Sequence, residues 1–108
     1  DPPPSEAPPP AAPQARASLS PNRPNPFNPH TTLGYAVPGV SPVPVRITIH
    51  SVGGRLVRTL VSRRVEPGYH EALWDGTNES REPVASGIYI GRAVIGAAAF
   101  ARKMTLLR

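Results

Sequence analysis

Hydrophobic and polar residues alternate along most of the chain after residue 30, with the period of two that is typical of half-buried strands. The clearest case is the stretch 43–51, in which Val45, Ile47 and Ile49 would share one face and polar side chains the other. The same reasoning predicts strands over 31–37, 43–51, 55–61, 69–74, 87–95 and 100–107. No window has the period of an amphipathic helix.

Turn residues separate these segments at intervals of about 8–12 residues. Pro38-Gly39, Glu66-Pro67-Gly68 and Gly96 each end a segment, and Gly53-Gly54 predicts a two-residue type I′ hairpin. Short strands at this spacing predict an all-β, antiparallel β-sandwich of about seven strands.

The beginning of the chain has a different composition. Eleven of the 16 prolines precede His30, and residues 1–17 hold Ala, Pro and a few polar side chains. Such a stretch has too little apolar surface to offset the entropy of ordering it. We therefore expect a disordered or extended Pro-rich linker or arm over 1–17 and a folded domain over 18–108. The arm is either a polyproline spacer or a PxxP-type ligand, and its degenerate repeats favour the spacer.

Residues 18–30 form a second Pro-rich stretch, which we call the Pro/Asn segment. Proline recurs at 21, 24, 26 and 29, and asparagine at 22, 25 and 28, which predicts an irregular, turn-rich path. Phe27 is its one large apolar side chain, and we expect it to anchor this segment to the core of the domain.

The net charge of +5 comes mainly from 11 arginines, and it raises the question of an acidic partner. The arginines are scattered, and those nearest to a cluster surround one predicted hairpin: Arg55, Arg58, Arg63 and Arg64. No aromatic residues alternate with them as stacking platforms would require, so a solvated Arg-rich surface is favoured over nucleic-acid binding. The chain has no cysteine, which argues against a eukaryotic disulfide scaffold but not against a bacterial exterior. No segment approaches the length of a membrane-spanning helix.

Residues with catalytic or metal-binding chemistry do not form a recognisable site. No serine lies in a nucleophile elbow, and no carboxylates are paired by alternate spacing on a strand. Asp75, Thr77 and Glu79 resemble the start of a calcium loop, but the glycine and the glutamate that should follow are missing. His50 and His70 could lie on neighbouring strands, yet two histidines without a third ligand are weak support for zinc. We expect a protein that is not an enzyme and has no cofactor or metal.

Two aromatic residues have structural interpretations. Trp74 ends a strand and is followed by the turn Asp75-Gly76, which is typical of a core tryptophan. Gly87 opens a later strand, and Tyr89 is expected to bury its ring while its hydroxyl reaches nearby backbone.

Taken in order, several short motifs resemble a known family. They are Pro24-Asn25-Pro26-Phe27-Asn28-Pro29, Thr31-Thr32-Leu33, Val45-Arg46-Ile47-Thr48-Ile49, Gly54-Arg55-Leu56-Val57-Arg58-Thr59-Leu60, Gly68-Tyr69-His70, Trp74-Asp75-Gly76, Pro83-Val84-Ala85-Ser86-Gly87-Ile88-Tyr89 and Arg102-Lys103-Met104-Thr105-Leu106-Leu107. Residues 19–108 resemble the Ig-like domain family named after the flagellar hook-capping protein. They are also similar to the type A C-terminal sorting domains of the type IX secretion system.

The resemblance implies an immunoglobulin-like sandwich at the C-terminus of a large secreted or surface protein. In the sorting family the domain is the export address. The matching signature positions are Asn25, Pro26, Phe27, Asn28, Pro29, Trp74, Asp75, Gly76, Gly87, Tyr89 and Lys103. The chain departs from the pattern at Arg81, where the family often has a small residue, and at Gly34 and Gly91, which replace larger strand residues.

We therefore expect a non-catalytic Ig-like module, extracellular or on a bacterial cell surface, that serves sorting, attachment or display. Its expected partners are proteins: the secretion machinery, domains of its parent chain, or copies of itself. An alternative is a self-assembling subunit of an extracellular filament or sheath, with Asp1 as its mature N-terminus and the Pro-rich arm packed on neighbouring subunits. A third hypothesis is binding of an acidic polymer through the region Arg55–Arg64.

Overall fold

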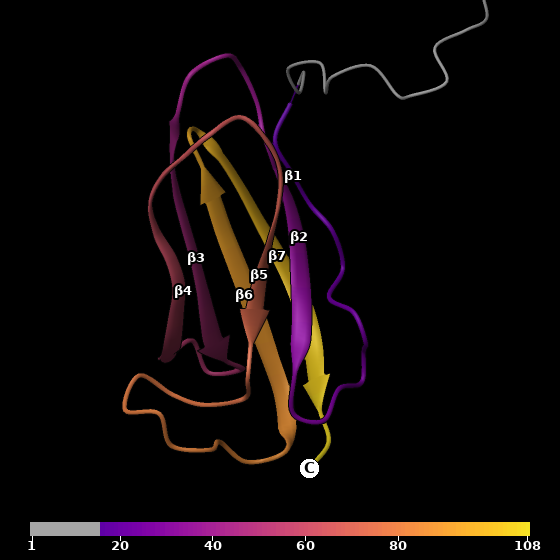
Figure 1. Cartoon of the computed structure of the whole chain (residues 1–108). Helices are drawn as coiled ribbons and strands as arrows, with labels where there is room; N and C mark the ends of the chain where they lie inside the picture. The colour runs from indigo at the N-terminus through magenta and orange to yellow at the C-terminus, as the bar shows by residue number, and fades with distance from the viewer. Residues whose placement is uncertain (1–15) are drawn as a thin grey trace, which may run out of the picture.

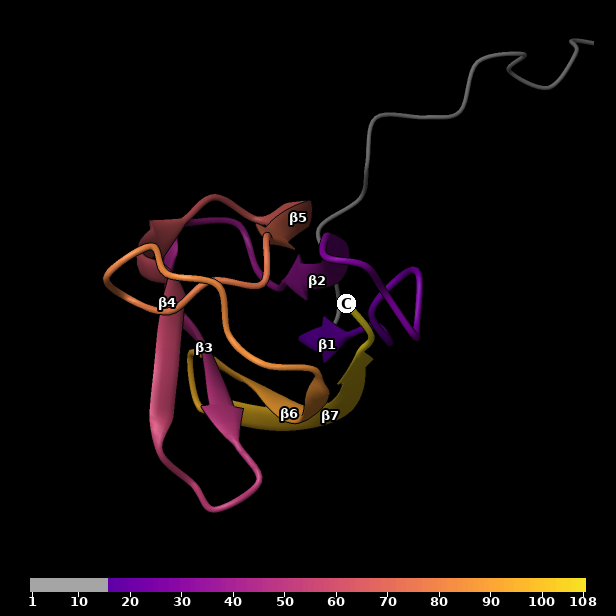
Figure 2. The same ribbon diagram turned by 90° about the horizontal axis from the view of Figure 1, so that it is seen from below.

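The computed structural model describes residues 16–108, which form two antiparallel β-sheets packed face to face (Figures 1 and 2). The strands are β1 (Ser18–Leu19), β2 (Thr31–Val37), β3 (Val43–Ser51), β4 (Leu56–Val65), β5 (Gly68–Trp74), β6 (Gly87–Ile95) and β7 (Ala98–Leu106). The predicted all-β sandwich of about seven short strands is confirmed. The described residues include no helix that could cross a membrane.

The smaller sheet has the order β1-β2-β5 and the larger the order β4-β3-β6-β7. All neighbouring strands are antiparallel. The bounds of β2, β3 and β6 are those expected from the alternation. β4 extends to Val65 instead of residue 61, and β7 starts at Ala98. The two-residue strand β1 was not predicted, because a pair of residues shows no periodicity.

The core lies between the sheets and is built from the inward positions of each strand. Val45, Ile47 and Ile49 of β3 are buried, as are Ala72 and Trp74 of β5. The outward positions between them are mostly exposed or half-buried. The predicted alternation is confirmed in β3 and β5 except at Thr48, which is on the outward side but buried, whereas both faces of β2 are largely buried.

The turn after β3 differs from the predicted two-residue type I′ hairpin. Gly54 has a positive φ of 95°, but Gly53 does not. The Gly54 N–H donates to the carbonyl of Ser51, and the Ser51 N–H donates to the carbonyl of Arg55, both at 2.9 Å. The loop is thus a β-turn followed by one left-handed glycine, which is the three-residue alternative for a hairpin. Register shifts in the β3–β4 pair accompany it.

Close packing explains the two strand glycines that depart from the family pattern. A Cβ on Gly34 would lie 1.8 Å from the Tyr69 hydroxyl oxygen, because the tyrosine ring lies across the glycine from the neighbouring strand. A Cβ on Gly91 would meet Leu33 and Met104 at 3.4 Å. Both positions thus make room for a neighbouring side chain.

The predicted linker, residues 1–17, lies outside the described residues except for its last two. Arg16 is exposed, and Ala17 packs against the core. The boundary between linker and domain at residue 18 stays a prediction.

Candidate functional site

Three aromatic side chains from distant parts of the chain meet at one end of the sandwich. The ring centroids of Phe27 and Trp74 are 5.5 Å apart, and those of Trp74 and Tyr89 are 5.2 Å apart in an edge-on arrangement. Phe27 is only 2% exposed, so it anchors the Pro/Asn segment in the core as expected. The offset geometry of such rings contributes beyond the area that they bury.

The polar atoms of this aromatic cluster are satisfied by backbone. Trp74 donates its Nε1–H to the carbonyl of Thr77 at 2.9 Å. The Tyr89 hydroxyl donates to the carbonyl of Ala85 at 2.6 Å, as expected from the sequence. Burial raises the pKa of this tyrosine above its ordinary value. The cluster is therefore a closed packing unit rather than a binding pocket.

The Pro/Asn segment runs beside the outer edge of β7. The Phe27 N–H donates to the Thr105 carbonyl at 3.0 Å, and the Leu107 N–H donates to the Phe27 carbonyl at 2.9 Å. The Asn25 Oδ1 accepts from the Thr105 N–H at 3.0 Å. These bonds cover the C-terminal half of β7, whose unpaired backbone would otherwise be open to another strand.

A buried pair that sequence reasoning missed holds the turn inside this segment. The Asn22 side-chain amide donates to the Thr31 hydroxyl at 3.0 Å and to the Pro24 carbonyl at 3.1 Å. The Thr31 hydroxyl donates to the same carbonyl at 2.9 Å. Alternation puts Thr31 on the same face as Leu33 and Tyr35, but it does not indicate that Asn22 is the partner of the buried hydroxyl.

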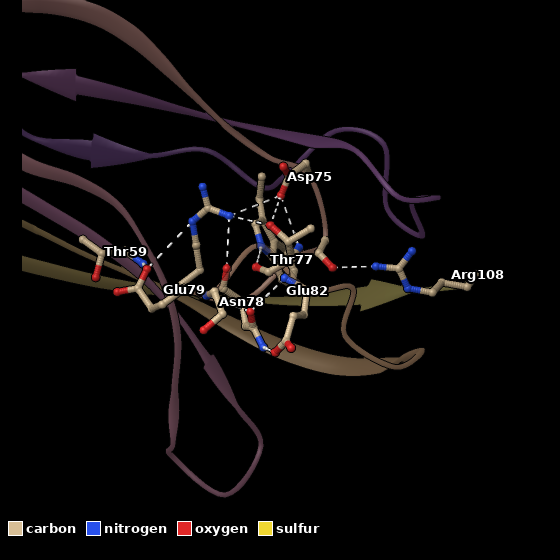
Figure 3. Close-up of polar contacts among 11 residues, drawn as sticks. Thr59, Asp75, Thr77, Asn78, Glu79, Glu82 and Arg108 are labelled. Carbon is tan, nitrogen blue, oxygen red and sulfur yellow. Dashed lines mark hydrogen bonds and ion pairs between the residues drawn. The ribbon is translucent and has the colours of Figure 1, made fainter.

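The loop after β5 is organised by Arg58 of β4, which the sequence analysis had grouped with exposed arginines. Its Nη1 lies 3.5 Å from the Asp75 Oδ1 and donates to the Thr77 hydroxyl, and its Nε lies 3.8 Å from the Glu79 Oε1. Glu79 also accepts from the Thr59 N–H at 3.0 Å (Figure 3). We call Arg58, Asp75, Thr77 and Glu79 the Arg58 network.

The carboxyl groups of the Arg58 network are stabilised in their charged form. A hydrogen bond from Thr77, helped by Arg58, holds the pKa of Asp75 below its ordinary value. A hydrogen bond from the Thr59 N–H does the same for the pKa of Glu79. The side chains that resembled a calcium loop are thus bound to protein donors. In residues 16–108 no three His, Asp or Glu side chains lie close enough to share a metal ion.

The last residue, Arg108, joins the same end of the sandwich. Its guanidinium donates to the carbonyls of Gly76 and Val84, and its backbone N–H donates to the Ser86 hydroxyl at 2.8 Å. Figure 3 shows its side chain directed toward the loop after β5. A Cβ on Gly76 would lie 3.1 Å from the Pro29 carbonyl oxygen, so the Pro/Asn segment packs directly on this loop. No sequence motif had singled out Arg108.

The signature positions therefore gather around one end of the molecule. Phe27, Trp74, Gly76 and Tyr89 are buried there, whereas Asn25, Pro26, Asn28 and Lys103 are exposed. Gly87 lies opposite Leu106 at the start of β6, and the Asn25 side-chain amide is 3.5 Å from the Lys103 carbonyl oxygen. The role of the exposed members in sorting or attachment stays a prediction.

The two strand histidines do not lie on neighbouring strands. His50 is on β3 and His70 is on β5, in different sheets. The His50 Nε2 is 2.8 Å from the Thr48 hydroxyl, and the His70 Nε2 is 2.7 Å from the Glu66 carbonyl oxygen. His70 also stacks on Tyr35, with ring centroids 5.5 Å apart. The neighbouring-strand placement on which the zinc hypothesis depended is therefore wrong.

The arginine cluster expected over Arg55–Arg64 is also dispersed. Arg58 is engaged in its network. Arg55 directly precedes the ten-residue strand β4, whereas Arg63 and Arg64 lie near its other end. A continuous cationic surface made by these four residues is therefore not present.

Two comparisons relate the chain to known proteins, and a third finds no match. A family model described as the FlgD Ig-like domain matches residues 30–94. The crystal structure of FlgD from Xanthomonas campestris, reported for hook capping essential for flagellar assembly, is similar in fold. It superposes with a TM-score of 0.56 at 21% sequence identity, over 84% of this chain and 67% of that one. No curated protein matches the sequence.

Proposed function

The chain belongs to the family of FlgD Ig-like domains, and from this premise we propose that it is a non-catalytic module for attaching, sorting or displaying a secreted bacterial protein. The observation that carries the proposal is the family match over residues 30–94, a span that contains most of both sheets. A domain of this kind acts through the surface that it presents to other proteins.

The bonding of the reactive side chains supports a role without catalysis. Asp75 and Glu79 are held by Arg58 and by neighbouring donors, and His50 and His70 bond to a hydroxyl and to backbone. The signature side chains Phe27, Trp74 and Tyr89 form packed core. Side chains held in this way stabilise the fold, and they are not arranged to act on a substrate.

The related FlgD takes part in hook capping, so we infer protein partners in an assembly outside the cell. Sorting through a type IX secretion machinery is the more specific form of the proposal. It rests on the resemblance of the sequence to type A sorting domains, especially around Lys103.

Deletion of residues 18–108 from the protein that carries them tests the proposal. Export and the amount retained at the cell surface would be measured by immunodetection in cell, surface and medium fractions. We expect loss of surface retention, or of export itself if the module is a sorting address. Unchanged amounts in all three fractions would contradict an attachment or sorting role.

The alternative of a self-assembling subunit is favoured by one specific observation. Within residues 16–108, no hydrogen bond reaches the outward-facing backbone of Ala99 and Ala101, and this part of the β7 edge is where a strand of another copy could pair. Sedimentation over a wide concentration range tests this alternative. A species that remains monomeric at the highest concentration would count against it.

A further inference from the structure

Two shallow hollows lie on the outer face of the larger sheet and meet at Val94. One, of about 320 Å³, is lined by Arg46 and Arg64 among others, and the second, of about 290 Å³, by Arg92, Ala99 and Ala101 among others. The strand register places Arg46 beside Val94 and Val94 beside Ala99. The hollows are therefore adjacent, with Val94 lining both, and together they extend across β4, β3, β6 and β7. We call the two together the arginine trough, defined by Arg46, Arg64, Arg92, Val94, Ala99 and Ala101.

The positive charge of the arginine trough is not neutralised by the rest of the described chain. The ion pairs within residues 16–108 involve Arg23 and Arg58, and none involves Arg46, Arg64 or Arg92. The Arg64 guanidinium donates to the Pro42 carbonyl at 2.8 Å, which fixes its position but leaves its charge uncompensated.

One carboxylate, that of Glu79, interacts electrostatically with an arginine of the trough. It feels the charge of Arg46, but its main partners are the Thr59 N–H and Arg58. An occupant of the trough would therefore be anionic.

The floor of the trough distinguishes between classes of anionic partner. Val94 is 45% exposed, and Ala99 and Ala101 add small apolar surfaces beside it. Trp74, Tyr35 and Tyr89 are buried, and Tyr69 belongs to the other sheet. Phe100 also borders the second hollow, but it is partly buried and packs against the core. The trough thus lacks a fully exposed aromatic ring on which bases could stack. An apolar floor with a cationic rim fits a protein segment better than a nucleic acid or a uniform polyanion.

The length of the trough sets the size of that segment. Four strands spaced about 4.8 Å apart span about 14 Å, which equals roughly four or five residues of extended chain. We propose that the arginine trough binds an extended acidic segment of a partner protein, in which carboxylates alternate with apolar side chains. A second copy of the chain is a poor occupant, because its own net charge is +5. The proposal rests on the assembly role described above and adds the chemistry of the partner.

Binding of defined probes to the full chain tests this proposal by isothermal titration calorimetry. The probes are a short peptide in which Glu alternates with Val, a peptide of equal charge in which Glu alternates with Ser, a heparin fragment and a single-stranded oligonucleotide. The Glu–Val peptide should bind most tightly, because only it complements both the rim and the floor.

Variants then locate the binding. The double change Arg46→Gln and Arg92→Gln should weaken the Glu–Val peptide by about tenfold or more. The matched control, Arg55→Gln and Arg81→Gln, removes the same charge outside the trough and should change affinity by less than about twofold. Val94→Thr should weaken the Glu–Val peptide and leave the Glu–Ser peptide unchanged.

Two results would contradict the proposal that the arginine trough binds an acidic segment. One is tighter binding of heparin or the oligonucleotide, weakened equally by both double variants, which would indicate a diffuse polyanion surface. The other is no detectable binding of the Glu–Val peptide. Surface retention of the parent protein is measured independently of peptide binding. The binding proposal and the proposed function can therefore be contradicted separately.

Discussion

At the scale of single residues, Phe27 shows how one side chain holds an irregular segment in place. It is the large apolar group of the Pro/Asn segment, it is 2% exposed, and it packs on Trp74. Phe27→Ala should lower the free energy of unfolding by about 3–5 kcal/mol, because it leaves a cavity beside the tryptophan. Urea denaturation measures this change. The control is Val40→Ala, because the Val40 side chain is 85% exposed. An equal loss of unfolding free energy in both variants would contradict the anchoring role of Phe27.

A second residue, Arg81, has a backbone conformation that is unfavourable for its side chain. Its φ is 65°, the left-handed region that costs an L-residue about 1–2 kcal/mol. Arg81→Gly should raise the free energy of unfolding by about 0.5–1 kcal/mol, since relief of strain outweighs the added entropy of the unfolded chain. Thermal unfolding would detect the gain. Arg81→Ala keeps the strain and should give no comparable gain. Equal stability of the Ala and Gly variants would refute this explanation.

At the scale of elements, the Arg58 network ties β4 to the loop after β5 and makes stability depend on pH. The pKa values of Asp75 and Glu79 are lower in the folded state than in the unfolded chain. Their contribution is therefore complete above the unfolded values, near about pH 4, and is lost as pH falls through the folded values. Urea midpoints should fall in this acid range, and the fall should be shallower in Asp75→Asn. Ser80→Ala in the same loop should keep the wild-type profile. If the urea midpoint of Asp75→Asn fell with pH as steeply as that of the wild type, the ion pair of Asp75 would not contribute to the pH dependence of stability.

The edge of β7 gives a second prediction at this scale. Asn25 accepts a hydrogen bond from the Thr105 N–H, whereas Asn28 makes no side-chain hydrogen bond to the described residues. Asn25→Ala should speed hydrogen exchange of the Thr105 amide about fivefold, as expected for loss of one bond of about 1 kcal/mol. Exchange followed by NMR provides the measurement. Asn28→Ala is the matched control, and an unchanged Thr105 rate in Asn25→Ala would mean that the edge is protected in another way.

At the scale of the whole molecule, the sequence was most informative where burial alternates. The sandwich and the strands β2, β3 and β6 followed from apolar spacing, and the anchoring by Phe27 followed from its being the one large apolar side chain in its segment. The Arg58 network and the Arg108 contacts could not be predicted from the sequence. Arginine side chains are long, and the partners of these two lie 17 or more positions away along the chain. The hairpin at Gly53-Gly54 was assigned the wrong type because two glycines permit more than one loop. The arginine trough depends on register between four strands, which no local pattern encodes.

The central claim is that this Ig-like surface itself mediates attachment of the protein that carries it. The most direct test replaces residues 18–108 in that protein by an unrelated Ig-like domain of similar size and measures the amount retained on the cell surface. The replacement preserves bulk and spacing but removes the signature positions and the arginine trough. We predict loss of surface retention with the protein still folded. Retention equal to that of the unaltered protein would contradict the claim and would reduce the module to a spacer.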